Sequence, residues 1–166
     1  MTLVDLHVHS DCSDDGVSSI TEYARRAVEM GLAEVGFCEH VDLDPRDCGY
    51  GYLEPGRYDQ EIAAARAHVS NVRLRQGIEI AYQASREDEV RAWLEGHEWD
   101  YVVTSVHVVD YSDGWAIISE PQTSAVFFAS HDQREAYLPY FEELLRAVQS
   151  GLGDVLGHFD LVKRYG

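Results

Sequence analysis

The chain has 166 residues, of which 45% are hydrophobic and 26% charged, as is typical of a globular domain rather than a disordered chain. Thirteen basic residues against thirty acidic ones give a formal net charge of −17. A chain this acidic repels nucleic-acid backbones and anionic membranes, so neither is an expected partner. No linker or repeat divides the chain, so we expect residues 1–166 to form a single domain.

The first half of the chain alternates short apolar runs with segments of helical period. Strands are predicted at 3–6, 34–38 and 72–78. Between the first two strands, Ser19 and Glu22 form a capping box that starts a helix, and Gly31 is a natural stop for it. A long loop rich in Asp, Gly, Pro and Tyr is predicted over 42–56, followed by a second helix over 58–69.

The second half continues this alternation. Ser85 opens a predicted third helix, and residues 101–106 carry the strongest β-signal in the chain. A short strand is predicted at 115–118, and Asp132 with Glu135 caps a long helix that ends at Gly151. Residues 154–157 form the last predicted strand. Repeated strand–helix order predicts an α/β fold with a mainly parallel sheet, either open or closed into a barrel.

Side chains that commonly bind metals follow the predicted strands. They are His7 and His9, then His40, Glu79, His107 and His158, in chain order. Because the carboxyl ends of parallel strands share one face, five segments deliver imidazole or carboxylate to one rim. His7 and His9 are two residues apart, so both point to the same side of an extended backbone. Imidazole and carboxylate suit zinc, iron or manganese, and the sequence therefore predicts a metal site.

Other histidines and one cysteine have less defined roles. His68 and His97 lie on or beside predicted helices among polar neighbours, which indicates surface positions. His131 starts the long helix, and both a contact with the site and a surface role stay open for it. Cys12 is either a small buried thiol or a soft metal ligand beside His9.

Five segments resemble motifs of the PHP (polymerase and histidinol phosphatase) superfamily. They are residues 5–10 with 13–16, then 37–42, 77–82, 105–110 and 157–165. A single His-x-His pair would be a weak signal, whereas five motifs in the family's order, from end to end of the chain, are specific. The Gly-Ile-Glu-Ile and Gly-His-x-Asp-x-x-Lys-Arg-Tyr stretches most resemble the histidinol-phosphate phosphatase branch.

The resemblance implies a distorted, seven-stranded β/α barrel with a metal centre of two or three divalent ions (Zn, Fe or Mn) at its C-terminal rim. Family members continue past the Lys-Arg-Tyr-Gly segment to further strands and a final Asp-x-His pair of ligands. The present sequence ends at Gly166, so the last strands and this pair are missing from it. Either a fragment or a natural short form is expected, and a short form needs its open edge covered, for example in a homo-oligomer.

The resemblance also implies which side chains hold the ions. It assigns His7, His9 and Glu79 to the first ion, Glu79 with His107 and His158 to the second, and Asp15 with His40 to the third. Asp15 is preferred to Asp14 because family members place this carboxylate six residues after the second histidine.

The implied activity is hydrolysis of a small phosphomonoester, most specifically L-histidinol phosphate to L-histidinol and phosphate in histidine biosynthesis. Metal-activated hydroxide would attack phosphorus, and the cationic centre would offset the charge of −17 that otherwise repels a phosphorylated substrate. Lys163 and Arg164 either clamp the phosphate or form a solvated basic turn. Asp160 either orients His158 or protonates the leaving alcohol.

Three other functions stay open at this point. An amidohydrolase also places His-x-His after its first strand, but it often uses a bridging lysine where this chain has Glu79. A PHP phosphoesterase could act on phosphotyrosine, nucleotides or nucleic-acid ends, the last disfavoured by the acidity. A truncated domain could bind metal or a partner without turnover.

Tyr50 and Tyr52 in the long loop either recognise the organic part of a substrate or only pack.

The expected location is the cytoplasm. Three cysteines are an odd number and too few for a disulfide framework, which favours a reducing compartment. The first residues lack the basic start and apolar stretch of a signal peptide, and no apolar run approaches the ~18 residues of a membrane-spanning helix.

Overall fold

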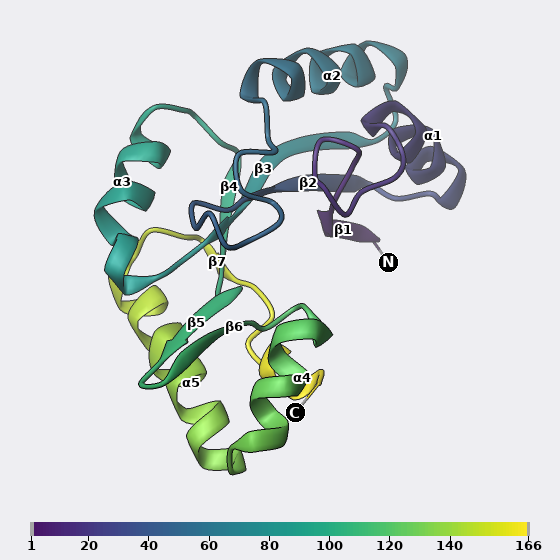
Figure 1. Ribbon diagram of the computed structural model, residues 1–166. Helices are drawn as coiled ribbons and strands as arrows, with labels where there is room; N and C mark the ends of the chain where they lie inside the picture. Colours follow the sequence, from purple (N-terminus) through teal and green to yellow (C-terminus); the bar gives the residue numbers. More distant parts are fainter. Residues whose placement is uncertain (1, 166) are drawn as a thin grey trace.

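The computed structural model describes residues 2–165 and has an open half-barrel of five parallel strands at its centre (Figure 1). The strands run in the order β1-β2-β3-β4-β7, with β1 and β7 at the edges. Their bounds are Val4–Val8 for β1, Glu34–Val41 for β2, Arg73–Ala81 for β3, Tyr101–Ser105 for β4 and Val155–Leu156 for β7. The predicted α/β fold with a mainly parallel sheet is therefore confirmed, and among the described residues the barrel is open.

Helices connect and cover the strands. They are α1 (Ile20–Met30), α2 (Pro55–His68), α3 (Glu87–Glu95), α4 (Pro121–Ser130) and α5 (Gln133–Ser150), with 3-10 turns η1 (Ala84–Arg86) and η2 (Leu161–Lys163). Both predicted capping boxes form, and both helices end at a left-handed glycine, as the sequence predicted. None of the helices in the described part is long and apolar enough to cross a bilayer.

The main hydrophobic core lies between the sheet and the helices α1 and α2, which share one side of it in Figure 1. Ile20 of α1 and Ile62 of α2 are almost fully buried against the outward-facing side chains of β2 and β3, such as Phe37 and Ile78. Burial of side chains of this size contributes about 1.5–3 kcal/mol each. This packing fixes the sheet and leaves its other face and its carboxyl ends free for polar groups.

Two elements between β4 and α5 were not predicted, the strand β5 (Val108–Tyr111) and the helix α4. β5 pairs antiparallel with β6 (Gly114–Ile117), and β6 corresponds to the short strand predicted at 115–118. The helix α4 packs against β6, and a second apolar cluster unites this hairpin with α5. The apolar residues of α4 at 125–128 are consecutive rather than spaced along one face, so they give no helical period.

The strands also extend further than predicted. β1 includes His7, β2 includes His40 and β3 includes Glu79, whereas each predicted strand ends before its ligand. Parallel pairing continues through His40, which lies directly opposite Glu79 in the register of β2 and β3, whereas the pairing of β1 with β2 is irregular between Asp5 and Val8, around His7. His40 and Glu79 therefore have a regularly paired backbone rather than a loop.

Tyr101 of β4 crosses the inner face of the half-barrel and reaches β1. Its hydroxyl donates a hydrogen bond of 2.8 Å to the Leu6 carbonyl on β1. A Cβ atom at Gly77 would lie 2.5 Å from the Tyr101 ring, and one at Gly36 would lie 2.5 Å from the hydroxyl oxygen. Because neither glycine has a Cβ atom, the Tyr101 side chain has room to pass over β3 and β2.

Replacement of Gly77 tests this packing. We expect Gly77→Ala to lower the free energy of unfolding by about 1–3 kcal/mol, because the Tyr101 ring must move away from the new methyl group. Gly56→Ala is the control: it lies in α2 with open space around it, and should stabilise by about 0.5–1 kcal/mol. Urea unfolding of both variants measures the difference, and equal stabilities would contradict the role of Gly77.

Candidate metal centre

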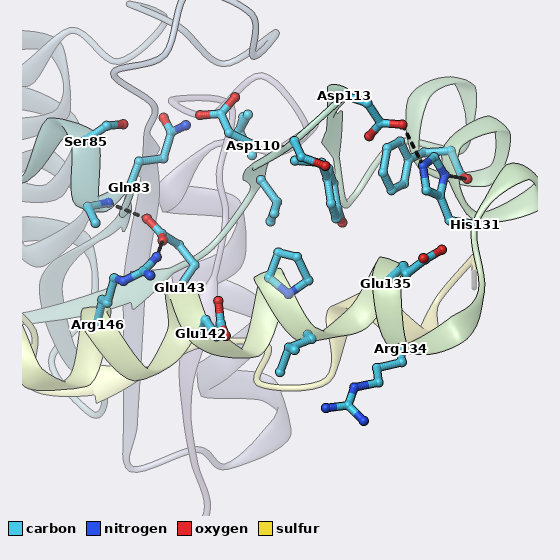
Figure 2. A pocket seen from close by; sticks show the side chains of 18 residues that line it. Gln83, Ser85, Asp110, Asp113, His131, Arg134, Glu135, Glu142, Glu143 and Arg146 are labelled. Carbon is cyan, nitrogen blue, oxygen red and sulfur yellow. Dashed lines mark hydrogen bonds and ion pairs between the residues drawn. The ribbon is translucent and has the colours of Figure 1, made fainter.

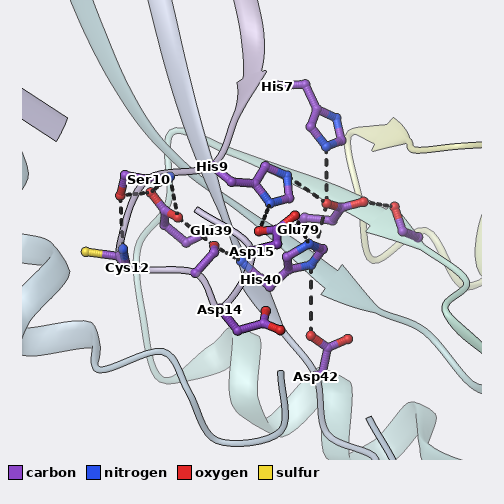
Figure 3. Close-up of polar contacts among 12 residues, drawn as sticks. His7, His9, Ser10, Cys12, Asp14, Asp15, Glu39, His40, Asp42 and Glu79 are labelled. Carbon is purple, nitrogen blue, oxygen red and sulfur yellow. Dashed lines mark hydrogen bonds and ion pairs between the residues drawn. The ribbon is translucent and has the colours of Figure 1, made fainter. Parts of the chain in front are cut away.

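The carboxylate of Glu79 is fully buried at the carboxyl ends of the strands and is surrounded by imidazoles (Figure 3). Its Oε2 lies 3.1 Å from His7 Nε2 and 3.2 Å from His9 Nε2. Its Oε1 lies 3.1 Å from His158 Nε2 and 3.5 Å from His107 Nε2. A buried charge is costly unless it is paired, so these contacts explain how the carboxylate is tolerated.

The same contacts control the ionisation of Glu79. Burial acts to raise its pKa, but hydrogen bonds from four histidines, led by His107 and His158, outweigh burial and hold the pKa well below its usual range. The Ser105 hydroxyl on β4 also donates a hydrogen bond to Oε1. Glu79 is therefore an ionised carboxylate whose two oxygens face different histidines, as a bridging ligand requires.

Five imidazole rings form a continuous cluster around this carboxylate. The His7 and His9 rings stack with centroids 5.1 Å apart, which agrees with the same-side orientation expected from their spacing. The His40 ring lies 4.3 Å from that of His9 and 5.0 Å from that of His107. Segments that are far apart in the sequence thus bring their nitrogen atoms to one place.

Asp15 joins the cluster from the loop after β1. Its Oδ1 lies 3.1 Å from His9 Nδ1 and its Oδ2 lies 3.6 Å from His40 Nε2. The contact with the His40 imidazole is the main cause that lowers the pKa of Asp15 to about 2. Asp14, which the sequence analysis set aside, instead accepts a hydrogen bond from the Cys48 thiol.

A further carboxylate, Asp42, was missed as a candidate ligand. It is buried, and its Oδ1 lies 2.9 Å from His107 Nδ1. Burial acts to lower the pKa of His107, but the charge of Asp42 and its hydrogen bond raise the pKa well above the ordinary value. The only sequence signal is its place two residues after His40, which in extended backbone is the same side of the chain.

The structure thus brings together all seven predicted ligands, and with Asp42 they form three compact donor groups of imidazole and carboxylate. The groups are His7–Glu79–His158, His9–Asp15–His40 and His40–Asp42–His107, each with its donor atoms within 4.8 Å of one another. A fourth group joins His7 and His9 with the buried Cys38, so these two histidines also lie close enough to share an ion, as the family resemblance implied. Another group, Asp11–Cys12–Glu61, lies apart, and there Arg57 already pairs with both carboxylates.

The donor set fits divalent cations. The Nδ1 atom of His40 is buried and has no hydrogen-bond partner, which is unfavourable unless another group binds it. Neutral imidazole nitrogens and carboxylate oxygens are the ligands of zinc, iron and manganese. Two of the three groups share His40, and the buried Glu79 faces imidazoles of more than one group.

Backbone geometry at His158 is unusual. With φ of 43°, it is the only non-glycine residue of the described chain in the left-handed region. The Tyr140 hydroxyl of α5 donates a hydrogen bond to its carbonyl group, and the preceding Gly157 leaves no room for a Cβ atom, which would lie 2.2 Å from Ser105 Oγ. Strained backbone of this kind persists only where surrounding contacts hold it, and here it directs an imidazole at Glu79.

The loop that carries His9 and Asp15 is organised by a second buried carboxylate, Glu39 (Figure 3). Glu39 accepts hydrogen bonds of 2.6 Å from both the Ser10 and the Ser13 hydroxyl groups, and one of 3.0 Å from the Ser10 backbone N–H. Burial raises the pKa of Glu39 in spite of these bonds. Sequence reasoning assigned no role to Glu39, because its partners lie 26–29 residues away.

The loop after β2 is held by Arg46. Its guanidinium pairs with the buried Asp44 and, at 2.5 Å, with Asp110 of β5, and it lies 5.3 Å from the centroid of the Trp115 ring. Hydrogen bonds from Arg46 are the main cause that lowers the pKa of Asp44 to about 2. This contact joins the loop that carries Asp42 to the β5–β6 hairpin.

The predicted substrate-contacting residues separate in the structure. Arg164 lines the cavity of about 420 Å³ that contains the histidine cluster, whereas Lys163 and Asp160 are exposed and are absent from its lining. The Asp160 side chain makes no hydrogen bond to His158 among the described residues, and its role stays a prediction. Tyr50 and Tyr52 are exposed on the loop, and Tyr50 lines a separate small cavity.

His131 lies away from the cluster. Its ring stacks on Phe127 and its Nε2 lies 3.0 Å from Asp113, at a larger cavity of about 730 Å³ beside α5 (Figure 2). His68 and His97 are exposed, as predicted, and Cys12 is a buried thiol. The pKa of Cys12 is raised to about 11, mainly by burial.

Comparison with known proteins decides the family. The family model described as the PHP domain matches residues 5–166. The chain belongs to the PHP domain family. A Deinococcus radiodurans protein named as a probable histidinol-phosphatase is 30% identical over 99% of this PHP chain and 63% of its own length. The histidinol-phosphatase of Lactococcus lactis is 26% identical, over 100% of the chain and 60% of its own length.

Solved structures give the same result. The crystal structure of a histidinol phosphate phosphatase from Lactococcus lactis, complexed with zinc, L-histidinol and phosphate, superposes with a TM-score of 0.84 at 27% identity. The match covers 98% of this chain and 60% of that one. A Listeria monocytogenes protein, at 19% identity and a TM-score of 0.72, shares the fold. The PHP chain therefore spans about 60% of the length of the first relatives that it matches.

Removal of the central carboxylate tests the metal centre. We expect Glu79→Gln and His7→Ala each to lower the amount of zinc or manganese that remains bound after dialysis, since each removes a donor atom at the centre of the cluster. His68→Ala removes an exposed imidazole elsewhere and should leave the metal content unchanged. Elemental analysis provides the measurement, and an unaltered metal content in Glu79→Gln would contradict the assignment.

The ion pair between Arg46 and the buried Asp44 is expected to stabilise the fold more than an exposed ion pair does. Arg46→Ala should lower the free energy of unfolding by about 3 kcal/mol, because the buried Asp44 loses its close partner and keeps only Arg86, whose Nε lies 3.9 Å away. Arg91→Ala, which breaks the exposed pair with Glu87 on α3, should cost less than about 1 kcal/mol. Denaturant titration of the two variants measures both losses of unfolding free energy, and similar losses would contradict a larger contribution from the Arg46–Asp44 pair.

Proposed function

We propose that this PHP chain hydrolyses a small phosphomonoester, most specifically L-histidinol phosphate to L-histidinol and phosphate. The observation that carries the proposal is the buried Glu79 carboxylate with imidazoles from four other segments of the chain around it. The support from relatives is their naming as histidinol-phosphatases and the zinc, L-histidinol and phosphate bound in the Lactococcus lactis structure.

The seven predicted ligands and Asp42 would hold divalent ions in the three donor groups. Bound ions of this kind lower the pKa of water toward neutrality and offset the charge of the phosphoryl oxygens. The protein's own contribution is to fix the donors. Glu79 and Glu39 are buried, the strands that bear His40 and Glu79 are paired, and His158 is held by Tyr140. Little reorganisation is then needed during the reaction.

Arg164 is the residue best placed to bind the phosphate. It lines the same cavity as the histidine cluster, and a guanidinium matches two phosphoryl oxygens at once. Lys163 is exposed and outside that lining, which favours its alternative role as a solvated basic residue. Asp160 would need to turn toward the cavity before it could protonate a leaving alcohol.

Phosphate release tests the proposal. The zinc- or manganese-loaded chain should release phosphate from L-histidinol phosphate, and prior treatment with a chelator should abolish this activity. His158→Ala should lower kcat/KM by roughly 100-fold or more, because it removes a donor at Glu79. His97→Ala, on the outside of the α3 segment, should retain activity.

The same experiment distinguishes hydrolysis from binding without turnover. A chain that retains two or three ions yet releases no phosphate would be a metal-binding domain rather than an enzyme. Release from phenyl phosphate or a nucleotide at higher kcat/KM than from L-histidinol phosphate would keep the phosphoesterase chemistry and overturn the substrate.

A further inference from the structure

Three buried polar side chains connect the loop after β1 to the strand β2 beside the metal centre (Figure 3). They are Ser10, Ser13 and Glu39, and Glu39 belongs to none of the groups of candidate ligands. The Ser10 hydroxyl lies 2.6 Å from one carboxylate oxygen of Glu39, and the Ser13 hydroxyl lies 2.6 Å from the other. Both oxygens of this carboxylate are therefore used within the protein and are not offered to an ion.

The backbone fixes the direction of each hydrogen bond in this network. The His40 N–H donates a hydrogen bond of 2.9 Å to the Ser13 hydroxyl oxygen, and the Cys12 N–H donates one of 3.2 Å to that of Ser10. A backbone N–H can only donate and a carboxylate can only accept, so each serine donates its single hydrogen to Glu39. Position 39 thus requires two acceptor oxygens, and the amide of a glutamine has only one.

The network touches every ligand of one donor group. His9 directly precedes the first serine, Asp15 lies two residues after the second, and the backbone N–H of His40 is itself a donor in the network. Among the residues that the structure describes, the serines and Glu39 form no hydrogen bond with the group that contains His158. The network is therefore placed to act on the His9–Asp15–His40 group in particular.

The position of Asp15 depends on this loop more than that of a strand residue does. Its side chain is 58% exposed, and its carboxylate is oriented only by the imidazoles of the cluster. The loop itself is tightly folded, because the Ser13 N–H donates to the Ser10 carbonyl group and a Cβ atom at Gly16 would lie 1.7 Å from that carbonyl oxygen. Glu79, by contrast, is held by regular pairing of β3 with both neighbouring strands.

We propose that Ser13 and Glu39 are positioning residues that set the affinity of the His9–Asp15–His40 group for its divalent ion, separately from the other ions of the centre. They act by holding the donors in place and contact neither the ion nor the substrate. The inference rests on the ion binding that the proposed function requires, but its test measures bound ions rather than phosphate release.

Ser13→Ala tests the inference. It breaks the link between the His40 N–H and Glu39, so we expect the Kd of one zinc ion to rise by about 10- to 100-fold while the other ions keep their Kd values. Glu39→Gln should have the same selective effect, because one serine hydroxyl loses its acceptor. The measurement is elemental analysis after dialysis against zinc held at known free concentrations by a chelator.

Asp15→Asn identifies which ion is affected. It removes a donor of the group directly, so the double variant with Ser13→Ala should hold as many ions as Asp15→Asn alone. His158→Ala acts on another group, so its loss should add to that of Ser13→Ala. Losses that add between Ser13→Ala and Asp15→Asn would place the effect on a different ion and overturn the assignment.

Ser124→Ala is the matched control. Ser124 is likewise fully buried, and its hydroxyl donates a hydrogen bond of 2.5 Å to the Glu120 carbonyl group at the start of α4. It does not line the cavity of the histidine cluster, so its loss should leave every Kd for zinc unchanged. A selective loss of one ion in this variant too would show a general effect of destabilisation and would overturn the role of Ser13.

The remaining outcomes are also decisive. Unchanged Kd values in both Ser13→Ala and Glu39→Gln overturn the inference, as does the absence of any ion that Asp15→Asn weakens. Should Ser13→Ala not fold, Ser10→Ala takes its place with the same expectation, since it removes one hydroxyl and keeps the backbone N–H bond to Glu39. A selective loss in a chain that releases no phosphate confirms the inference while the proposed function fails.

Discussion

The interaction on which the site depends is the ionised carboxylate of Glu79, fully buried at the end of a central strand. A charge in this position is stable only if polar groups that pair with it surround it. The imidazoles of His7, His9, His107 and His158 meet this need from three segments of the chain. The convergence that suits metal binding is therefore also the condition for burying Glu79.

Two further carboxylates hold the loops that complete the site. Glu39 gathers the serines of the loop after β1, and Asp44 binds Arg46, which also reaches the β5–β6 hairpin. Each of these acidic residues has a specific partner, so part of the net charge of −17 is structural. The cavity itself combines this acidity with imidazoles and one guanidinium.

The assignment of the chain to the PHP family agrees with its parallel half-barrel fold. The PHP model covers residues 5–166, and the solved histidinol phosphate phosphatase superposes over 98% of the chain. The described residues bring the seven predicted ligands together, and the chain spans about 60% of the length of that relative. The donors on β1, β2 and β3 come from neighbouring strands, so local pairing is enough to assemble them.

The sequence by itself determined the alternation of strands and helices, both capping boxes and the seven candidate ligands, because these depend on local spacing and on the order of motifs. It did not reveal α4, whose apolar residues lack helical spacing and which forms by packing on β6. Only the tertiary structure decided the partners of Asp42, Glu39 and Arg46, and the separation of Arg164 from Lys163. Those roles depend on contacts between residues that are tens of positions apart, and local periodicity carries no information about such contacts.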